Sequence, residues 1–408
     1  MKSVAEQLEL IRRGAEQIVP EAELVKKLER SAKTGKPLRV KLGIDPTGKD
    51  LHLGHTVALR KMRVFQELGH QAVLIIGNYT ALVGDPSGRI ETRPRLTPEQ
   101  VAANATDYLR QISAVIDIEK AEKHYNGDWF GRMTFLDVMT LMSKITVQRI
   151  LERDDFTKRL SSVPSIPIYL HECLYPLMQG QDSVAIHADV ELGGSEQLFN
   201  LQVGRRLQED AGQEPQVCLT LPILRGLDGE QKMGKSVGNY IGVGEPAYDQ
   251  FAKTMSIPDD LMREWFTLLT DRRAEEIARL SNPNATHPRD AKLTLAGDIV
   301  RGYHGEEASK KATEEWIKRN TNRQDPSEIP EVGISTAQLT DGKLPVSKLL
   351  VALKLAPSNN EARRLIQGGG VTLGPQRDKV TDVNATVAVV SGLIVRVGNR
   401  KVVRVRVE

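Results

Sequence analysis

Short apolar runs alternate along the first half of the chain with longer stretches in which apolar side chains recur every three or four positions. The apolar runs have the length and composition of buried strands, and they lie at residues 38–44, 71–77, 184–188 and 217–224. The periodic stretches have the spacing of amphipathic helices, and they lie at residues 55–68, 98–116, 134–152 and 195–211. This alternation over residues 34–245 predicts an α/β domain with a doubly wound parallel sheet. The segment from about 90 to 180 is expected to be an insertion between its two halves.

The flanking segments have other patterns. Residues 1–33 mix acidic and basic positions with a helical period and predict an arm that packs on the body. Residues 246–320 predict a helical domain with charged faces. Residues 321–342 are rich in Pro, Asp, Thr and Ser, lack a period and predict a linker.

The last segment, residues 343–408, predicts a small α+β domain of two short helices followed by strands. It carries 12 Lys and Arg against 4 Asp and Glu, a net charge of +8, whereas the whole chain carries +3 and residues 1–342 therefore carry −5. Arg404 and Arg406 alternate with valines, so both arginines are expected on one face of a strand. A basic module on an acidic body indicates nucleic-acid binding, although a solvated edge strand also carries such residues.

Length and composition agree with a soluble protein of two to three domains. The chain has 408 residues and lacks an apolar run of about 18 residues, the length that a membrane-spanning helix requires. Its first residues lack the apolar core of a signal peptide. Cys173 and Cys218 form no disulfide framework, so we expect a reducing cytoplasm.

Two motifs carry the candidate chemistry. His52-Leu53-Gly54-His55 follows the first predicted strand and opens a helix, where free backbone N–H groups attract anions. Lys232-Met233-Gly234-Lys235-Ser236 lies in a glycine-rich segment and predicts a movable lid that holds a polyphosphate. Taken singly, the first motif could be a chance match or a metal site, and the second a solvated turn. Zinc is disfavoured because neither cysteine lies near His52 in the sequence.

In this order and setting, the pair resembles the HIGH and KMSKS signatures of class I aminoacyl-tRNA synthetases, with Leu53 and Gly234 as the departures. The resemblance implies a Rossmann-like catalytic domain. It also implies that His52 and His55 stabilise the transition state at the α-phosphate of ATP, and that Lys232 and Lys235 neutralise the leaving pyrophosphate. The ATP-binding residues that it implies are Gly54, His55, Gly194, Glu196, Met233, Lys235 and Ser236. Mg²⁺ is expected with the ATP phosphates, without a metal held by the protein.

A second set of residues indicates the amino acid. Tyr175, Gln179 and Asp182 are spaced i, i+4 and i+7, so they project from one face of a helix. This spacing resembles the Tyr-x-x-x-Gln-x-x-Asp helix of tyrosyl-tRNA synthetases, where Tyr and Gln hold the α-amino group and Asp accepts from the phenolic hydroxyl. An amphipathic helix with a solvated polar face is the alternative, but Leu174, Leu177 and Met178 flank these positions and favour burial.

Three turns resemble the same family. They are Asp45-Pro46-Thr47, the loop from Gly84 to Gly88, and Gly193-Gly194-Ser195-Glu196-Gln197. The resemblance implies that Asp45, Asp85 and Gln197 bind tyrosine, that Glu196 binds the ribose, and that Thr47 contacts a phosphate. Each could instead be an ordinary turn, but loops after parallel strands are where open α/β sheets bind ligands.

One position departs from the family. Many tyrosyl-tRNA synthetases have a Tyr four residues before the aspartate of the Asp-Pro-Thr turn, where it contacts the substrate hydroxyl; here the residue is Lys41. Lys41 could donate to the phenol oxygen or turn to pair with a nearby acid, and the sequence leaves both open. With the His-Leu-Gly-His motif, this departure resembles the second bacterial subgroup.

The C-terminal module resembles an S4 RNA-binding domain, which implies contacts to RNA from Lys348, Arg363, Arg364, Arg404 and Arg406. The resemblances together imply a ligase that joins L-tyrosine to tRNA(Tyr) at the expense of ATP, acting as a homodimer without a membrane partner. A tryptophanyl enzyme and an RNA-binding relative without activity are the alternatives.

Overall fold

The structure is a computed structural model that describes residues 2–48, 50–86, 96–321, 324–398 and 401–408. The chain divides into two compact units, Met1–Glu306 and Glu307–Glu408, each with its own hydrophobic core. None of the helices in the described ranges is long and apolar enough to cross a membrane.

A six-stranded sheet forms the centre of the first unit, in the order β1-β6-β5-β2-β3-β4. Its strands are β1 (Gln17–Val19), β2 (Arg39–Ile44), β3 (Gln71–Ile76), β4 (Glu122–Tyr125), β5 (Val190–Gly194) and β6 (Val217–Leu221). Strands β2 to β6 are parallel to their neighbours, and β1 pairs antiparallel with β6. From β2 the chain moves outward to β3 and β4, then returns to place β5 on the other side of β2. The order therefore reverses between β2 and β5, which is where doubly wound sheets bind ligands.

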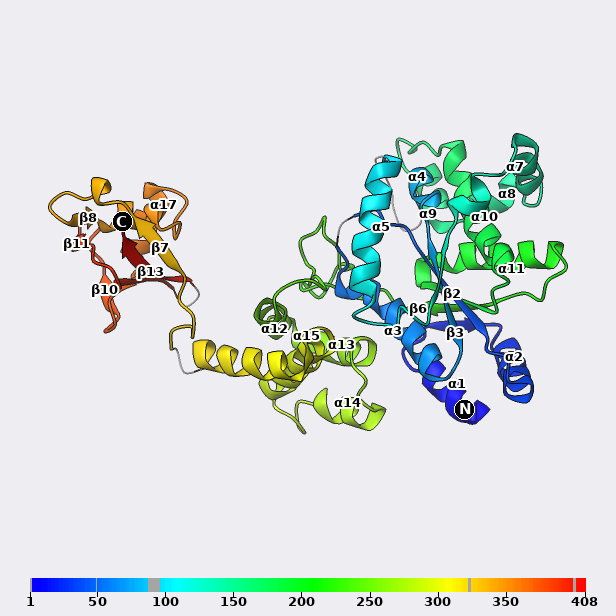
Figure 1. The fold of residues 1–408 in the computed structure, drawn as a ribbon, viewed down its shortest axis with the longest axis horizontal. Helices are drawn as coiled ribbons and strands as arrows, with labels where there is room; N and C mark the ends of the chain where they lie inside the picture. Colours follow the sequence, from blue (N-terminus) through cyan, green and yellow to red (C-terminus); the bar gives the residue numbers. More distant parts are fainter. Residues whose placement is uncertain (1, 49, 87–95, 322–323, 399–400) are drawn as a thin grey trace. The chain divides into compact units, whose positions relative to one another are not determined.

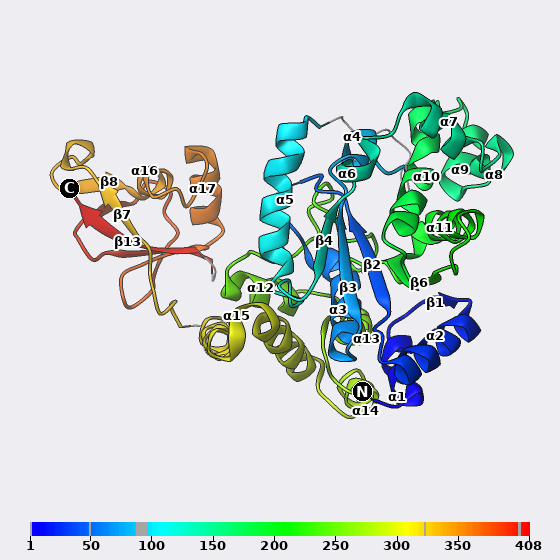
Figure 2. The ribbon, with the colours of Figure 1, turned by 45° about the vertical axis from the view of Figure 1, so that its right-hand side comes forward.

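Helices lie on both faces of this sheet, with α3 and α5 on one side and α10 and α11 on the other (Figure 1, Figure 2). The helices that precede β5 are α1 (Val4–Arg12), α2 (Glu21–Thr34), α3 (Leu53–Glu67), α4 (Thr80–Val83), α5 (Pro98–Ile112), α6 (Gly127–Phe130), α7 (Phe135–Met142), α8 (Val147–Leu151), α9 (Asp154–Ser161) and α10 (Leu170–Ala185). Those that follow β5 in this unit are η1 (Ser195–Gln197), α11 (Leu198–Asp210), α12 (Ala247–Met255), η2 (Asp259–Leu261), α13 (Met262–Leu269) and α14 (Ala274–Leu280). Local sequence sets the ends of these helices. For example, Thr97 caps α5 by accepting from the Gln100 backbone N–H, and Pro98 occupies the first turn.

Three secondary-structure predictions are wrong in part. The apolar run at residues 184–188 is not a strand, because it continues from the buried end of α10, and the strand is β5 at Val190–Gly194. A short apolar run alone does not distinguish a strand from a helix end. The single helix predicted for residues 134–152 is two helices, α7 and α8, because Thr146 caps a new one. The N-terminal arm contains β1 besides its helices.

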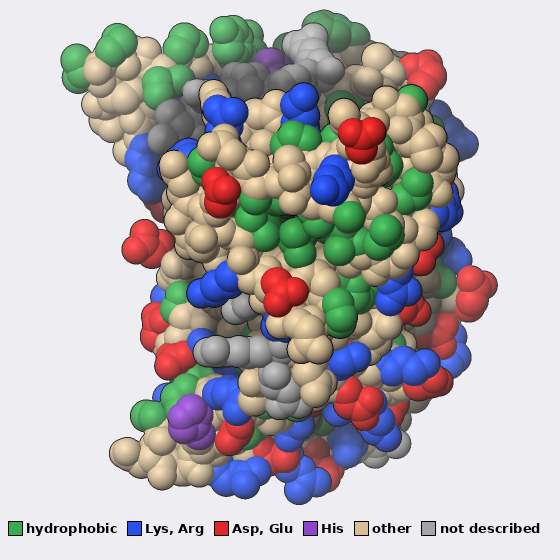
Figure 3. All heavy atoms as spheres, turned by 90° about the vertical axis from the view of Figure 1, so that its left-hand side faces the viewer, with side chains coloured by type: hydrophobic (Ala, Val, Ile, Leu, Met, Phe, Trp, Pro, Cys, Tyr) green, Lys and Arg blue, Asp and Glu red, His purple; other side chains and the backbone are tan. Residues whose placement is uncertain are grey.

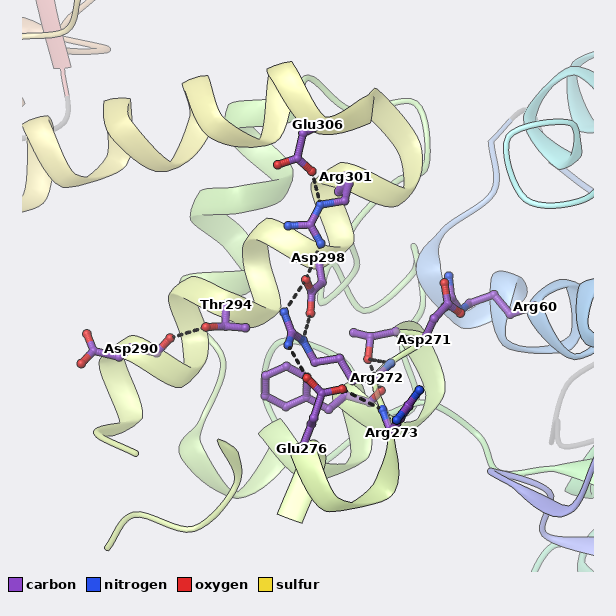
Figure 4. Close-up of polar contacts among 12 residues, drawn as sticks. Arg60, Asp271, Arg272, Arg273, Glu276, Asp290, Thr294, Asp298, Arg301 and Glu306 are labelled. Atoms are coloured by element: carbon purple, nitrogen blue, oxygen red, sulfur yellow. Dashed lines mark hydrogen bonds and ion pairs between the residues drawn. The ribbon is translucent and has the colours of Figure 1, made fainter. Parts of the chain in front are cut away.

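The segment between α13 and α14, helix α14 and the start of α15 (Pro288–Asn320) are connected by ion pairs, shown in Figure 4. Asp298 of α15 accepts from Arg272 and Arg301, and Arg272 also pairs with Glu276 of α14. Asp271 pairs with Arg60 of α3, so this helical segment is joined to the helix that the first motif opens. Helix α15 is interrupted at Gly305, whose φ of 83° is accessible to glycine at little cost.

The second unit is a small α+β module. Its helices are the end of α15, η3 (Thr336–Gln338), α16 (Val346–Ala352) and α17 (Asn359–Gln367). Its strands are β7 (Glu331–Ile334), β8 (Lys343–Pro345), β9 (Val371–Leu373), β10 (Asp378–Val380), β11 (Thr386–Ala388), β12 (Ile394–Val397) and β13 (Lys401–Val407). Five of them form a sheet in the order β10-β9-β12-β13-β7, and β11 pairs with β8.

The segment expected as a linker is partly structured. Strand β7 falls within residues 321–342 and pairs parallel with β13, so the sheet of the second unit begins before residue 343. Sequence reasoning missed this strand because four residues without an apolar run gain their order only from a distant partner. Strand β13 lies between β12 and β7, which removes the edge-strand explanation for its arginines. Residues 399 and 400, between β12 and β13, lie outside the described residues.

Candidate active site

The first motif lies where the chain passes from β2 into α3. His52 immediately precedes the helix, and the ring centroids of His52 and His55 are 3.8 Å apart. The His52 backbone N–H donates to His55 Nδ1 over 3.2 Å. A Cβ on residue 54 would come within 3.0 Å of the His52 ring, so glycine lets this ring pack against the helix start. His52 Nδ1 is buried and has no hydrogen-bond partner among the described residues, which leaves one polar atom for a ligand.

Backbone pairing brings the second motif to the first. Leu53 N–H donates to Ile241 C=O over 3.0 Å, and Val243 N–H donates to Leu51 C=O over 2.8 Å. The buried Asn239 closes the base of the loop, since its Oδ1 accepts from Gly234 N–H over 2.9 Å and its Nδ2 donates to Asp228 over 2.8 Å. The lysine loop is therefore anchored beside the start of α3, although the two motifs lie 177 positions apart.

The side chains of the second motif differ in their exposure to solvent. Met233 is 1% exposed and packs in the core, whereas Lys232, Lys235 and Ser236 are exposed. Lys232 Nζ lies 3.4 Å from Glu196 Oε1. A Cβ on Gly48 would be 3.5 Å from Lys235 Nζ, so this ammonium group lies over the turn that contains Thr47. Both cations thus face the loops that follow β2 and β5.

Burial, aided by the nearby lysines, keeps the two histidines neutral. Burial, with smaller contributions from Lys235 and Lys232, lowers the pKa of His52 to about 4. The pKa of His55 is also well below its usual value, through burial and then the charges of His52, Lys235 and Lys232, although part of this residue is open to solvent. At pH 7 both imidazoles are therefore neutral, and each can donate one hydrogen bond to an anion.

The second cluster lies under α10. Tyr175 donates from its hydroxyl to Asp45 Oδ2 over 2.9 Å, and Thr80 donates to Asp45 Oδ1 over 2.7 Å. A Cβ on Gly77 would lie 2.0 Å from Asp45 Oδ1, so only glycine at this strand end leaves room for the carboxylate. Asp45, at the end of β2, is thus joined to the first residue of the i, i+4, i+7 set.

Asp182 is a buried carboxylate with two neutral donors. Trp129 Nε1–H donates to Oδ1 over 3.0 Å, and Asn126 Nδ2–H donates to Oδ2 over 3.3 Å. Burial raises the pKa of Asp182 to about 7, against the opposing charge of Lys41 and the two hydrogen bonds. A carboxylate held at the edge of ionisation in an apolar setting is typical of a group that awaits a ligand.

A chain of amides connects Gln179 to the loop after β5. Asn200 Nδ2 donates to Gln179 Oε1 over 2.9 Å and to Gln197 Oε1 over 3.0 Å. Gln197 in turn donates to Asp85 Oδ2 over 2.9 Å. The structure thus brings Gln179, Gln197 and Asp85 together, as the family resemblance implied. Ser87 and Gly88 of the same loop lie outside the described residues.

Lys41 takes the second of its two possible orientations. Its Nζ lies 2.9 Å from Glu191 Oε1 and donates to Gln179 C=O and Ser183 Oγ, each over 2.7 Å. Both members of the ion pair are buried, at 0% and 1% exposure. Lys41 therefore pairs with an acid on the neighbouring strand β5 in this structure.

Comparison with known proteins identifies the family. Residues 33–320 match the family described as tRNA synthetases class I (W and Y). The tyrosine–tRNA ligase of Symbiobacterium thermophilum is 52% identical over 406 residues, which cover 99% of this chain and 98% of that protein. The tyrosine–tRNA ligase of Aquifex aeolicus is 48% identical over 400 residues, 98% of each chain. The chain belongs to the tyrosyl-tRNA synthetases.

Solved structures agree with the fold of this synthetase. Tyrosyl-tRNA synthetase from Archaeoglobus fulgidus, solved in complex with L-tyrosine, is 26% identical and superimposes with a TM-score of 0.61, covering 76% of this chain and 100% of that one. A C-terminally truncated mitochondrial tyrosyl-tRNA synthetase from Aspergillus nidulans superimposes with a TM-score of 0.64 at 21% identity, covering 78% of this chain and 94% of that one, which supports the fold alone. The class I fold expected from the two motifs is confirmed.

Sequence reasoning missed several groups around the pocket of this synthetase. They are Thr80, Asn126, Trp129, Glu191, Asn200 and Asn239. Asn126 follows β4, and polar residues at the carboxyl end of a parallel strand are a usable signal. That signal is weak here because Glu122–Tyr125 lacks an apolar run and falls within the expected insertion.

The expected RNA-binding residues of this synthetase are all exposed. Lys348 lies on α16, Arg363 and Arg364 lie on α17, and Arg404 and Arg406 lie on β13. The alternation is confirmed, since Val403 and Val405 are buried whereas Arg404 and Arg406 are exposed. Three of these arginines have acidic partners, because Arg364 pairs with Glu361, Arg404 with Glu331 and Arg406 with Glu408.

Proposed function

We propose that this site activates L-tyrosine with ATP and then transfers the tyrosyl group to the 3′ end of tRNA(Tyr). The observation that carries the proposal is the face of α10, where Tyr175 donates to Asp45 and Asp182 accepts from Trp129. Gln179 of the same face is connected through Asn200 to the loop after β5, whose Glu196 pairs with Lys232. Membership of the family supports the activity, and the contacts described above support the role of each residue.

Tyrosine would lie with its amino group near Tyr175, Gln179 and Asp85, and with its phenol near Asp182. The amino group is a cation, and Asp45 and Asp85 supply negative charge on that side of the pocket. Gln197 would contact the carboxyl end of the substrate. Asp182 would accept a hydrogen bond from the phenolic hydroxyl.

In the first step, a carboxylate oxygen of tyrosine attacks the α-phosphorus of ATP. A new O–P bond forms while the bond from this phosphorus to the pyrophosphate oxygen breaks, and pyrophosphate leaves with its electron pair. His52 and His55 donate hydrogen bonds to the α-phosphate as it becomes crowded, and Thr47 contacts a phosphate oxygen. Lys232 and Lys235 neutralise the charge that accumulates on pyrophosphate. Catalysis then consists of positioning and charge stabilisation.

The remaining site residues would hold the nucleotide. Gly54 and Gly194 let the chain approach ATP closely, Glu196 binds the ribose hydroxyls, and Met233 and Ser236 line the base of the lid. Mg²⁺ bound to the phosphates would screen their charge. We expect the phosphates rather than the protein to carry it. The described residues contain no group of three or more His, Cys, Asp or Glu side chains that could hold a metal ion.

In the second step, the terminal ribose hydroxyl of tRNA attacks the carbonyl carbon of tyrosyl-adenylate. The ester bond forms, the mixed anhydride breaks, and AMP leaves. This step requires no covalent enzyme intermediate.

Tyrosine-dependent exchange of pyrophosphate into ATP tests the first step directly. We expect exchange with tyrosine and little with tryptophan or phenylalanine. Exchange driven by tryptophan would favour the tryptophanyl alternative, and a protein that binds RNA without exchange would be a relative that lost the chemistry.

We also propose that the basic second unit binds tRNA. Seen from the side of this unit, blue Lys and Arg side chains are interspersed with acidic and apolar ones (Figure 3). The RNA contacts are therefore expected to be several separate phosphate contacts, from the five exposed residues of α16, α17 and β13 named above.

Removal of residues 322–408 should leave tyrosine-dependent exchange intact and weaken tRNA charging. The cut precedes β7, since a cut at residue 343 would leave this strand without its partner β13. For every RNA phosphate that the second unit neutralises, its removal should reduce the slope of log affinity against log salt by about 0.7 to 0.9. Charging should therefore fall more steeply with salt for the full chain than for the shortened one, and equal slopes would argue against RNA binding by this unit.

A homodimer is a further part of the proposal, supported by apolar residues that are open to solvent on consecutive helices of the insertion. These include Phe135 (81% exposed), Leu136 (74%), Val147 (73%), Val163 (98%) and Leu170 (85%). Large exposed apolar surfaces usually mark protein interfaces. The residues lie on or beside α7 to α10, and α10 carries the tyrosine-binding face.

Location in the cytoplasm remains a prediction from the use of cysteine.

Replacing Leu136 and Leu170 together with Glu should convert the dimer to a monomer, because two buried carboxylates would face an apolar partner. Sedimentation velocity at several protein concentrations measures the mass. Leu160→Glu provides the control, because Leu160 is less exposed and its replacement should change the mass less than the double variant does. If the double variant sediments like the unchanged chain, the interface lies elsewhere.

A further inference from the structure

The ion pair of Lys41 and Glu191 lies directly beneath the residues that are proposed to bind tyrosine. Lys41 is on β2 and Glu191 on β5, the two neighbouring strands between which the strand order reverses. Their Nζ–Oε1 distance is 2.9 Å, and both side chains are almost completely buried. A pair of charges removed from water in this way costs desolvation energy, so it is a weak device for stability alone.

The polar atoms of Lys41 and Glu191 contact Gln216 and helix α10, which carries the proposed tyrosine-binding residues. Lys41 donates to the carbonyl of Gln179 and to the hydroxyl of Ser183, residues that flank Asp182 in α10. Glu191 accepts from Gln179 Nε2 over 3.0 Å and from Ser183 Oγ over 3.0 Å. Gln216 Nε2 donates to the same carboxylate from its other side. The pair thus fixes both the backbone and the side-chain amide of Gln179.

The Gln179 amide is held from two directions as a result. Its Nε2 donates to Glu191, and its Oε1 accepts from Asn200, whose own Oδ1 accepts from the buried Arg153 over 2.8 Å. Because Glu191 occupies Nε2, Oε1 is fixed as the acceptor end of this amide, and Asn200 uses one of its two lone pairs. An acceptor is what an ammonium group requires.

The two members of the pair also act on Asp182 with opposite sign. The Lys41 charge lowers the pKa of Asp182 and the Glu191 charge raises it, with Lys41 the larger of the two. The other groups that face Asp182 are the neutral donors Asn126 and Trp129, with His124 packed against Trp129 at 6.5 Å between ring centroids. Asp45 lies further along the same hydrogen-bond chain through Thr80.

We infer that Lys41 and Glu191 act as a positioning pair for tyrosine, orienting the Gln179 amide and the part of α10 that carries Asp182 without contacting the substrate. The inference rests on the proposed function and adds how the pocket is supported. It also explains the orientation of Lys41, because Glu191 on the next strand holds its ammonium group.

The experiment compares three variants of the full chain: Lys41→Met, Glu191→Gln and the double variant. The first readout is tyrosine-dependent pyrophosphate exchange. We expect Lys41→Met to raise the KM for tyrosine by about 10-fold or more and to change the KM for ATP by less than about 2-fold, because the pair supports only the amino-acid side of the pocket. The double variant leaves no unpaired buried charge and keeps the measurement possible if a single variant fails to fold.

The second readout is the ratio of kcat/KM for tyrosine to that for phenylalanine, measured from pH 6 to pH 8.5. The ratio cancels ionisations that affect both substrates and leaves that of Asp182, which only the hydroxyl senses. Its midpoint should lie near 7 in the unchanged chain, should fall in Glu191→Gln, and should rise in Lys41→Met and in the double variant. A merely structural pair would not displace the midpoint in opposite directions.

Asp298→Asn is the matched control, since it removes an acid from the Arg272 and Arg301 pairs of α15 (Figure 4). It should lower the melting temperature without changing the tyrosine KM or the midpoint. Folded variants of Lys41 and Glu191 with unchanged KM and midpoint would overturn the inference. So would a Tyr/Phe ratio that Lys41→Met lowers equally at every pH, because this would place Lys41 at the hydroxyl. Absence of tyrosine-dependent exchange in the unchanged chain would instead refute the proposed function itself.

Discussion

Lys235→Ala and Lys232→Ala should each slow tyrosine-dependent pyrophosphate exchange by about 100-fold or more while leaving the affinity for tyrosine nearly unchanged. Pyrophosphate gains charge as its bond to the α-phosphorus breaks, so a cation placed at that point stabilises the transition state more than the ground state. Lys235 lies over the turn that contains Thr47, and Lys232 lies 3.4 Å from Glu196, so both face the nucleotide side of the site.

Pre-steady-state formation of tyrosyl-adenylate measures the loss of rate, and equilibrium binding of tyrosine measures the affinity. Lys120→Ala is a suitable control, because Lys120 is an exposed lysine whose partner is Asp117. The loop itself should stay in place in both variants, since Asn239 and the buried Met233 anchor it. A wild-type exchange rate in either lysine variant would mean that the loop does not close over pyrophosphate.

The sequence predicted the parts of this site that depend on local spacing. The three positions 175, 179 and 182 share a helix face whatever surrounds the helix, and His52 and His55 lie at the helix start because an apolar strand precedes them. The doubly wound sheet followed from the same kind of pattern. Such features are encoded within short stretches of the chain.

The groups that complete the site depend on contacts between distant segments. Glu191 reaches Lys41 only because β5 pairs with β2. The sequence placed this strand at residues 184–188, whereas it lies at Val190–Gly194, so Glu191 fell outside the predicted strand. Asn126 and Trp129 reach Asp182 because β4 extends the sheet, and Glu122–Tyr125 has no apolar run to reveal it. Strand β7 likewise forms against β13, at the far end of the second unit's sequence. Local pattern does not determine such pairings, so the partners of Lys41 and Asp182 required the fold.

Asp182→Ala should reduce kcat/KM for tyrosine far more than for phenylalanine. A buried group that hydrogen-bonds a substrate hydroxyl disfavours an analogue that lacks the hydroxyl, because the hydrogen bond is then lost. Tyrosyl-tRNA synthetases are themselves the standard example of this discrimination. Our inference concerns only the residue that produces it. Asp182 is 4% exposed and has Trp129 and Asn126 as its donors. Lys41, the other candidate contact for the hydroxyl, is paired with Glu191. Asp182 should therefore carry most of the selectivity.

The discrimination between tyrosine and phenylalanine should depend on pH. Burial raises the pKa of Asp182 to about 7, so the group is mostly protonated at pH 6 and mostly ionised at pH 8. A carboxylate accepts a hydrogen bond from the phenol more strongly than the protonated acid does. The Tyr/Phe ratio of kcat/KM should therefore rise with pH through about 7 in the unchanged chain, and it should be flat in Asp182→Asn, which keeps the shape of the side chain without its charge. If Asp182→Ala lowers kcat/KM for both amino acids equally, then Asp182 supports the fold of the pocket and another group reads the hydroxyl.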